Sequence, residues 1–463
     1  AYIGNTLADR MQHDGWLETR IQAIFPDHSL VFRNLGYPGD ELKERIRADN
    51  FGSPDEWLSK VEADVIFGFF GYNEAFRGPD GLADFERDLA EILDGMLGQT
   101  YNGESAPRIV MFSPIAHEDL NSPHLPDGSE NNGNLEQYTA AMQKVCQQKK
   151  VPFVDLFHPT QAMYAASEEP LTLNGIHLLT SGNRLLAGHV VEHLFGDSAN
   201  VDWSADEWAR LNEAVLDKNL HWFSRYRVVD EYNVFGGRSK LAWFGQSNAD
   251  VMMREMEIFD VMASNRDERV WAVARGSELK VLDDNLPEEL VVQTNKPGPL
   301  DDGKFEYMSA EETLGSMTLG KGLEGNVFAS EEMFPEMINP VQMAVDPDGR
   351  LFVSVWPSYP HWNPVKKRRD RILCLPDEDG DGVADECRIF ADELNSVTGI
   401  EFWGGGLLVA APPEIWFLKD TDGDDVADVK VRMLQGVSSA DTHHSANAMV
   451  IGSDGGLYLS LIH

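Results

Sequence analysis

Cysteine, basic residues and long apolar runs are all scarce in this chain. It has three cysteines, and 38 lysines and arginines stand against 77 aspartates and glutamates, so the formal net charge is −39. A chain this acidic repels phosphate backbones and anionic lipid surfaces, which argues against a nucleic-acid partner. No run of about 18 apolar residues occurs, so the sequence predicts no transmembrane segment.

A signal peptide is also missing, and both ends of the sequence look like interior strands. Residues 1–7 have the pattern of a strand running into a loop, and residues 456–463 end within a strand pattern. We therefore expect a fragment of a longer, periplasmic or extracellular protein whose targeting signal lies outside this sequence. In such an oxidising compartment a disulfide could join Cys374 to Cys387, and two free thiols are an equal alternative.

Length and apolar content indicate a folded chain of two or three domains. The chain has 463 residues, of which 42% are hydrophobic, enough to form a sizeable core. The pattern changes twice along the chain. We expect an α/β domain over 1–200, a mixed connector over 201–335 that packs on the first domain, and an all-β region over 336–463.

The first region alternates buried strands with amphipathic helices. Near-continuous apolar runs of this kind are typical of parallel sheets covered on both faces, so the pattern predicts a doubly wound α/β fold. The predicted strands are 30–35, 63–70, 108–113 and 151–156, and the predicted helices are 9–24, 38–49, 82–98, 134–149 and 180–195.

The third region repeats two short phrases. A strand–turn–strand phrase occurs at 341–355, 399–410 and 448–460, and an acidic phrase at 375–385 returns at 418–428. The acidic phrases are 43 positions apart, counted from Asp377 to Asp420. Repeats of about 40–50 residues built from short strands predict β-propeller blades. Since propellers usually close with about four to eight blades, we expect an incomplete propeller.

Four polar blocks lie where strands end in the first region. They are Gly4–Leu7, Gly36, Gly71–Glu74 and Asn174–His177. Their order and spacing resemble the SGNH, or GDSL, hydrolase superfamily. The resemblance implies a flavodoxin-like, three-layer α/β fold and hydrolysis of esters of lipids, acylated sugars or small acyl donors, without a cofactor.

The resemblance also implies roles for residues in these blocks. His177 matches the general base, and Gly36 and Asn73 match the two positions that hold the oxyanion. Two positions depart from the family: Thr6 replaces the nucleophilic serine, and Asn174 replaces the supporting aspartate. The threonine methyl group crowds the line of attack. Loss of a triad carboxylate can lower turnover by about 10⁴-fold.

These departures leave three functional hypotheses for the first domain. The leading one is an ester hydrolase acting on a small-molecule or carbohydrate ester, with Thr6 attacking and His177 as base. A water molecule activated by His177 could replace Thr6 as the nucleophile. A degenerate hydrolase that serves as a non-catalytic binding or scaffold protein is the alternative from another class.

Two acidic loops in the last region have the alternating carboxylates of calcium loops. Calcium takes about six to eight oxygen ligands. The twelfth position lacks the glutamate of an EF-hand, so we expect shorter calcium loops of the kind found in secreted repeat proteins, or else acidic hairpin tips. The candidate ligands are Asp377, Asp379, Asp381 and Asp385 in one loop, and Asp420, Asp422, Asp424 and Asp428 in the other.

A second resemblance covers most of the chain. The acidic loops, the segment 222–238 and residues 441–447 resemble large planctomycete-type secreted proteins whose propellers are described as PQQ-type or sorbosone-dehydrogenase-like. This resemblance implies a PQQ- or haem-linked sugar dehydrogenase as a further alternative. The sequence contains no Cys-x-x-Cys-His haem motif. Because neighbouring strand residues point to opposite faces, at most one of His443 and His444 would face a propeller mouth.

Overall fold

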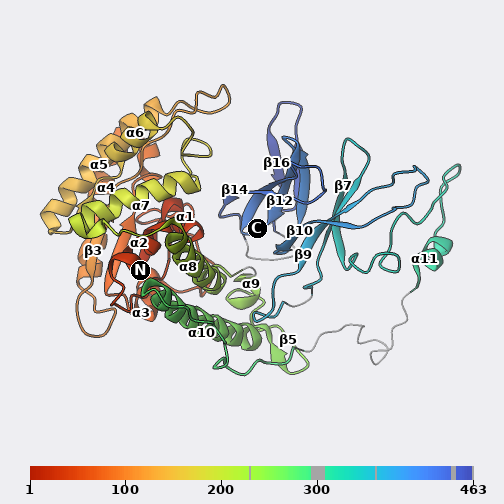
Figure 1. Ribbon diagram of the computed structural model, residues 1–463, viewed down its shortest axis with the longest axis horizontal. Coiled ribbons are helices and arrows are strands. Elements are labelled where there is room, and N and C mark those ends of the chain that lie inside the picture. Colours follow the sequence, from red (N-terminus) through yellow and green to blue (C-terminus); the bar gives the residue numbers. More distant parts are fainter. Residues whose placement is uncertain (229–230, 293–307, 360–361, 439–444, 461–463) are drawn as a thin grey trace. The chain divides into compact units, whose positions relative to one another are not determined.

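The computed structural model describes residues 1–228, 231–292, 308–359, 362–438 and 445–460 (Figure 1). It contains two compact units. Unit 1 consists of residues 1–228 and 256–288, and unit 2 of residues 229–255 and 289–463. The segment 201–335, predicted as one connector, is therefore divided between the units. Among the described residues, no helix is long and apolar enough to cross a membrane.

A four-stranded parallel sheet with the order β1-β2-β3-β4 forms the centre of unit 1. Asn34 adds a parallel bridge to Tyr2 on the free side of β1, so the predicted strand 30–35 is reduced to this bridge. Counting that segment as second in the chain, the spatial order is 2-1-3-4-5, the flavodoxin-like order. The strands are β1 (Tyr2–Gly4), β2 (Val65–Phe69), β3 (Arg108–Phe112) and β4 (Phe153–Val154).

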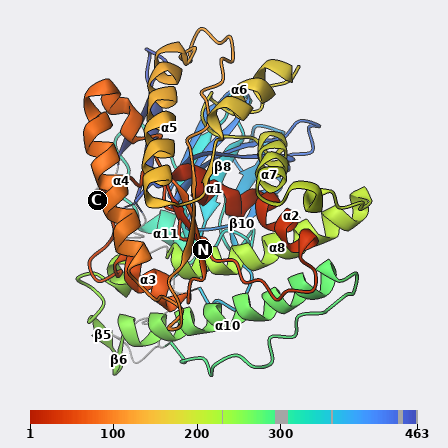
Figure 2. The same ribbon diagram turned by 90° about the vertical axis from the view of Figure 1, so that its left-hand side faces the viewer.

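Helices cover both faces of this sheet. Right-handed crossovers place the helices between β1 and Asn34 on the opposite face from those that follow β2 and β3. Accordingly α4 packs on α5, and α2 packs on α7 (Figure 2). The helices are α1 (Thr6–Asp14), α2 (Trp16–Ile24), α3 (Pro54–Lys60), α4 (Leu82–Leu97), α5 (Ser129–Lys149), α6 (Phe157–Ala166) and α7 (Thr180–Phe195), with short 3₁₀ turns at Glu74–Gly81 and Gly196–Ala199.

The predicted helix at 38–49 is wrong. Gly39 has a φ of +83°, which is outside the helical region. The Arg47 guanidinium donates two hydrogen bonds of 2.8 Å to the buried Asp40 carboxylate, which closes the segment into a loop. A bidentate pair of this kind fixes a loop that amphipathic spacing alone would not reveal.

Two long helices beyond residue 200 complete unit 1. Helix α8 (Ala205–Tyr226) and the unit 1 part of α10 (Asn248–Ala274) share an apolar cluster with α2. Buried Lys218 of α8 donates to Glu18 at 2.8 Å, and the Trp222 indole donates to the Asn34 carbonyl at 2.7 Å. These contacts make α8 part of unit 1. The cluster consists of Ala23, Leu211, Ala214, Val215, Val270 and Ala274.

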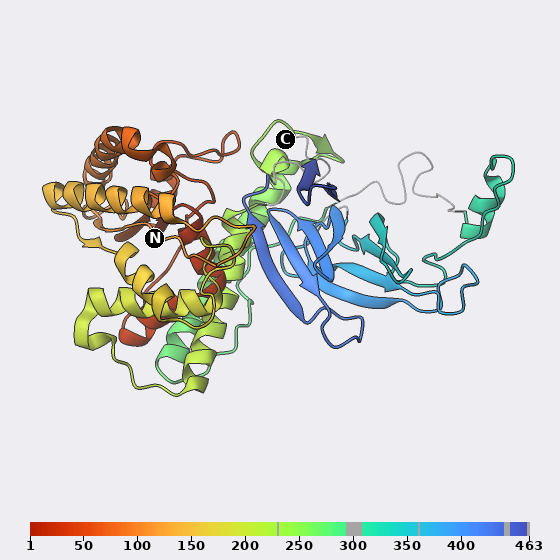
Figure 3. The same cartoon turned by 90° about the horizontal axis from the view of Figure 1, so that it is seen from above.

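Unit 2 is built mainly from antiparallel sheets (Figure 3). Two four-stranded sheets, β10-β9-β8-β7 and β11-β12-β13-β14, share one apolar core, and β15 pairs with β16. The strands are β7 (Pro340–Val345), β8 (Leu351–Val355), β9 (Asp370–Leu375), β10 (Arg388–Leu394), β11 (Gly399–Trp403), β12 (Gly406–Ala411), β13 (Glu414–Lys419), β14 (Val429–Gln435), β15 (Ala448–Ile451) and β16 (Leu457–Ser460).

The remaining elements of unit 2 are short, namely α9 (Glu231–Val234), the hairpin β5 (Ala242–Trp243) and β6 (Gln246–Ser247), and α11 (Ala310–Ser316). The all-β character of the last region is confirmed, but the described sheets do not form a closed propeller. His443 and His444 lie outside the described residues. Cys146, Cys374 and Cys387 are free thiols, so the alternative of a disulfide between the last two is wrong.

Candidate active site

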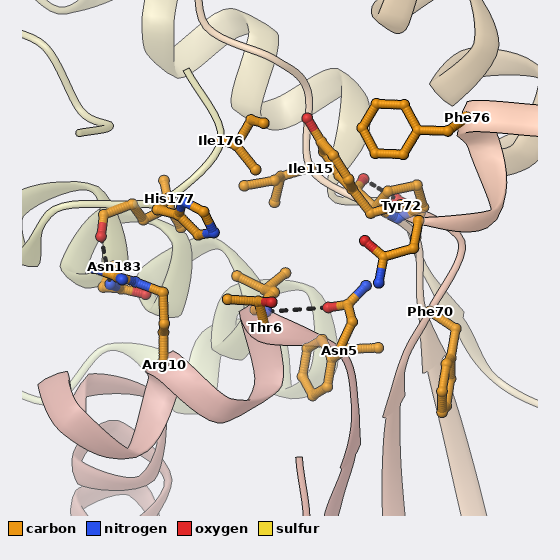
Figure 4. Close-up of a pocket in the computed structure, with 16 residues that line it drawn as sticks. Asn5, Thr6, Arg10, Phe70, Tyr72, Phe76, Ile115, Ile176, His177 and Asn183 are labelled. Carbon is orange, nitrogen blue, oxygen red and sulfur yellow. Dashed lines mark hydrogen bonds between the residues drawn. The ribbon is translucent and has the colours of Figure 1, made fainter. Parts of the chain in front are cut away.

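A pocket of about 160 Å³ opens where β1, β2 and β3 end (Figure 4). In the flavodoxin-like order, the chain leaves neighbouring β1 and β2 toward opposite faces, and ligands bind at such switch points. The pocket is lined by Asn5, Thr6, Leu7, Arg10, Phe69, Phe70, Tyr72, Asn73, Phe76, Ser113, Pro114, Ile115, Ile176, His177, Leu178 and Asn183.

Thr6 enters the pocket as the first residue of α1 (Figure 4). The preceding Asn5 caps the helix, because its Oδ1 accepts a hydrogen bond of 3.1 Å from the Leu7 N–H. Gly4 must be glycine, since a Cβ there would lie 2.0 Å from the Phe69 carbonyl oxygen. The Thr6 hydroxyl is therefore held at a helix N-terminus, where the helix dipole favours negative charge.

His177 lies across the same pocket from Thr6, on the loop before α7 (Figure 4). Its Nδ1 is 3.1 Å from Asn174 Oδ1, which also accepts from the His177 N–H at 3.0 Å. The amide oxygen can only accept, so Nδ1 carries the proton and Nε2 is the basic nitrogen. Asn174 thus orients the ring as the aspartate of a triad would, without its charge.

The pocket keeps the His177 ring uncharged at neutral pH. Burial, and to a smaller extent the nearby Arg10 guanidinium, together lower the pKa of His177 to about 4. A histidine in water titrates near 6.5, so the ring is the neutral, proton-accepting form at pH 7. Arg10 was not predicted, although it lies four residues after Thr6 and so on the same face of α1.

The two predicted oxyanion residues have different surroundings. Asn73 lines the pocket, and its Nδ2 lies 3.3 Å from the Asp40 carbonyl oxygen. The Gly36 N–H instead donates to Asn34 Oδ1 at 2.8 Å, and Gly36 is not a lining residue. A Cβ at Gly36 would lie 2.6 Å from the Asp9 nitrogen, so close packing on α1 requires this glycine. The structure therefore brings Thr6, Asn73 and His177 together, but not Gly36.

Glu74, which the sequence placed in the same polar block as Asn73, is buried beside it. Glu74 is 3% exposed, and its carboxylate accepts hydrogen bonds from the N–H groups of Gly71 at 2.9 Å and Leu42 at 3.0 Å. Burial raises the pKa of Glu74. Glu74 ties the end of β2 to the loop that contains Asp40, and so holds Asn73 at the pocket.

The acidic loops of unit 2 bring part of each predicted ligand set together. Oxygen atoms of Asp377, Asp379 and Asp385 lie within 4.8 Å of one another, as do those of Asp420, Asp422 and Asp424. Asp381 instead accepts from the Val383 N–H at 2.8 Å, and Asp428 accepts from the Thr421 hydroxyl. Each loop thus offers three converging carboxylates, a donor set that suits a hard divalent cation.

Asp425, which takes the place of the turn glycine in the second loop, has a different use. Its φ is +62°, a conformation that glycine adopts more easily. Its carboxylate pairs with Arg350 and Arg388, and Arg388 follows the first acidic loop. Asp425 therefore links the two loops through an ion pair, which the sequence pattern did not reveal.

Two segments of the chain each match a known protein family. Residues 6–185 match the GDSL-like lipase/acylhydrolase family, and residues 309–461 match a domain of unknown function (DUF7133). The match over residues 6–185 supports the resemblance to GDSL-type hydrolases that the polar blocks indicated. No curated protein matches the chain.

Three solved structures are among those to which part of this chain is similar. The chain is 14% identical to an acetyl xylan esterase, AlAXEase, over 42% of this chain and 100% of that chain, with a TM-score of 0.32. It is 14% identical to Axe2, an acetylxylan esterase from Geobacillus stearothermophilus, over 43% of this chain and 94% of that chain, with a TM-score of 0.33. It is 14% identical to BT4096, a gut microbial diltiazem-metabolizing enzyme, over 41% of this chain and only 45% of that chain, with a TM-score of 0.33. Likenesses this distant do not bear on substrate.

Proposed function

We propose that unit 1 hydrolyses short-chain esters, with Thr6 as the nucleophile and His177 as the general base. The observation that carries this proposal is that Thr6 and the Asn174-oriented His177 ring line one pocket, within a segment that matches an acylhydrolase family. A hydroxyl nucleophile needs an adjacent base, and that base needs a group that orients it. All three groups are present here, with an amide in place of the usual carboxylate.

In the proposed reaction, Thr6 Oγ1 attacks the ester carbonyl carbon while His177 Nε2 takes the hydroxyl proton. The carbonyl oxygen becomes negative, and the N-terminus of α1 and the Asn73 amide group stabilise it. His177 then gives the proton to the departing alcohol, which leaves an acyl group on Thr6. His177 Nε2 then takes a proton from water as the water oxygen attacks that acyl group, the bond to Thr6 Oγ1 breaks, and His177 returns the proton to Oγ1 as the acid is released.

The dimensions of the pocket favour a small acyl group. A pocket of about 160 Å³, close to the roughly 150 Å³ of a cavity that holds benzene, suits a short acyl chain, and apolar side chains such as Ile115 and Ile176 form much of its wall. Phe76 lines the same pocket and is 64% exposed, so its ring offers a flat apolar surface to an alcohol group such as a sugar ring. We propose an acylated carbohydrate as the substrate class.

A panel of aryl and sugar esters with acyl chains of increasing length tests this function. We expect acetates to react fastest, and kcat/KM to rise with pH around a midpoint near 4 and stay level through neutrality, because only the neutral His177 accepts a proton. Absence of ester hydrolysis by the folded chain would rule out the proposal. A midpoint near 6.5 would instead indicate a solvated histidine as the base.

We also propose that the acidic loops of unit 2 bind calcium, because three carboxylates converge in each. Calcium should raise the melting temperature of the chain, since a ligand present at about 100 times its Kd stabilises the folded state by about 2.7 kcal/mol. Asp377→Asn should reduce the rise, and Asp348→Asn, a neighbouring exposed site, should not. Equal melting temperatures with calcium and with a chelator would contradict the proposal.

The sheets of unit 2 support a propeller-like arrangement, which we retain as a proposal. In each sheet, the strand that comes first in the chain contacts the first strand of the next sheet. These strands are β7, β11 and β15, and β11 contacts both of the others. Blades of a propeller are arranged in this way around their axis. The alternatives of a scaffold protein and of a PQQ- or haem-linked dehydrogenase gain no support from the comparisons, since the family matched by residues 309–461 has no known function.

A further inference from the structure

One buried carboxylate near the pocket has no part in the proposed chemistry. Glu118 follows β3, is 6% exposed and does not line the pocket. Its carboxylate accepts hydrogen bonds from the Leu171 N–H at 3.0 Å, the Thr172 N–H at 2.7 Å and the Thr172 hydroxyl at 2.6 Å. A buried carboxylate is costly unless donors satisfy it, so this arrangement holds those donors firmly.

The donors belong to the loop that carries His177. Gly175, two residues before His177, donates its N–H to the Thr172 hydroxyl oxygen at 2.9 Å, and its carbonyl accepts from the Glu118 N–H at 2.9 Å. The Leu173 N–H donates to the His177 carbonyl at 2.8 Å. Glu118 therefore contacts the start of the loop with its side chain and the residue beside Asn174 with its backbone.

Residues 117 and 118 are themselves fixed to α5. Asn132 of that helix accepts from the His117 N–H at 2.8 Å and donates to the His117 carbonyl at 2.9 Å. The His117 ring lies against Gly175, where an added Cβ would come within 2.4 Å of Nε2. The loop of His177 is thus tied, through Glu118, to a helix that is anchored on the sheet.

We propose that Glu118 is a positioning residue for the proposed hydrolase, which holds the loop of Asn174 and His177 so that the imidazole faces Thr6. The effect on catalysis rests on the proposed function, whereas the hydrogen bonds that hold the loop do not. A displacement of a catalytic group by about 1 Å can cost about 100-fold in rate. Five hydrogen bonds in this network involve Glu118 or the Thr172 hydroxyl that it holds.

Glu118→Gln in the full chain tests the inference, with Glu136→Gln on the exposed face of α5 as the matched control. The glutamine NH₂ group cannot accept hydrogen bonds, so it would lose those that the glutamate oxygen accepts from the backbone N–H groups. We expect kcat for an aryl acetate to fall by about 100-fold with KM changed less than about twofold. Glu118→Asp, which restores the charge on a shorter side chain, should recover part of the loss.

Two NMR measurements separate positioning from activity. In Glu118→Gln the amides of Leu171, Thr172 and Gly175 should exchange faster with solvent. The pKa of His177 should also move from about 4 toward about 6.5 as the ring becomes solvated. Unchanged exchange and titration would overturn the proposal. If the wild-type chain hydrolyses no ester, the proposed function fails, while these two measurements still decide the role of Glu118.

Discussion

His177→Ala is expected to lower kcat for short-chain esters by about 10²–10⁴-fold, the usual contribution of a general base. The ring is the only histidine among the residues that line the pocket. Asn174 fixes its tautomer, and burial keeps it neutral at pH 7. Alanine removes the proton acceptor without introducing bulk or charge, so KM should change little.

Thr6→Ala distinguishes the two possible nucleophiles in the same assay. If Thr6 attacks, the variant should lose activity as completely as His177→Ala, because residues that act as one unit are not additive. Activity that survives Thr6→Ala but not His177→Ala would assign the attack to a water molecule activated by His177. His124→Ala, on an exposed loop, serves as the control. Equal rates for wild type and His177→Ala would refute the hydrolase assignment.

Asn174→Asp is expected to raise kcat, but by less than the about 10⁴-fold that the reverse change costs in a serine hydrolase triad, because there the amide also imposes the wrong tautomer of the histidine, whereas Asn174 already holds the proton on Nδ1. The amide oxygen already lies 3.1 Å from His177 Nδ1, so a carboxylate would need no new geometry. Its negative charge would stabilise the imidazolium that forms when Thr6 gives up its proton. Asn200→Asp, an exposed amide-to-acid change, provides the control.

The pH profile of Asn174→Asp gives a second, independent outcome. A carboxylate beside the ring favours its charged form, so the pKa of His177 should rise from about 4 toward or above 6.5. Since the protonated ring cannot act as a base, the rise in kcat/KM with pH should move upward by the same amount. A raised midpoint without a raised rate would mean that imidazolium formation does not limit the reaction.

The natural Asn174 has a clear physical consequence under this scheme. With an amide in that place, the base remains neutral down to about pH 4, so the pocket is competent in acid but weakly basic. Under the proposed mechanism we expect lower turnover at neutral pH than in Asn174→Asp, in exchange for a wider working pH range. The measured rates of wild type and Asn174→Asp at pH 5 and pH 8 would quantify that exchange.

Local patterns in the sequence determined the kind of fold and the position of the candidate site. Apolar runs marked β2, β3 and β4, and amphipathic spacing marked α4 and α7, because period and burial are encoded residue by residue. Short polar blocks after strands located Thr6, Asn73 and His177, since parallel strands end at one edge of the sheet. The alternating, turn-rich pattern of the last region likewise predicted antiparallel strands.

Hydrogen bonds and ion pairs between particular side chains were decided only by the tertiary structure. The ion pair of Arg47 with Asp40 lies in a loop where a helix was predicted. The Gly36 N–H, which was expected to bind an oxyanion, donates its hydrogen bond to Asn34 Oδ1 instead. The assignment of α8 to unit 1 depended on a buried ion pair between Lys218 and Glu18. Hydrogen bonds and ion pairs of this kind leave no periodic pattern in the sequence, because each depends on where the fold places two particular groups.

The site shows the same division. The sequence determined which groups could react, since a hydroxyl, an imidazole and an amide are chemical identities. Only the tertiary structure set the neutral state of His177, through burial and the neighbouring Arg10, and the anchoring of its loop by Glu118. Desolvation and orientation are properties of the packed surroundings, so they exist only once the chain has folded.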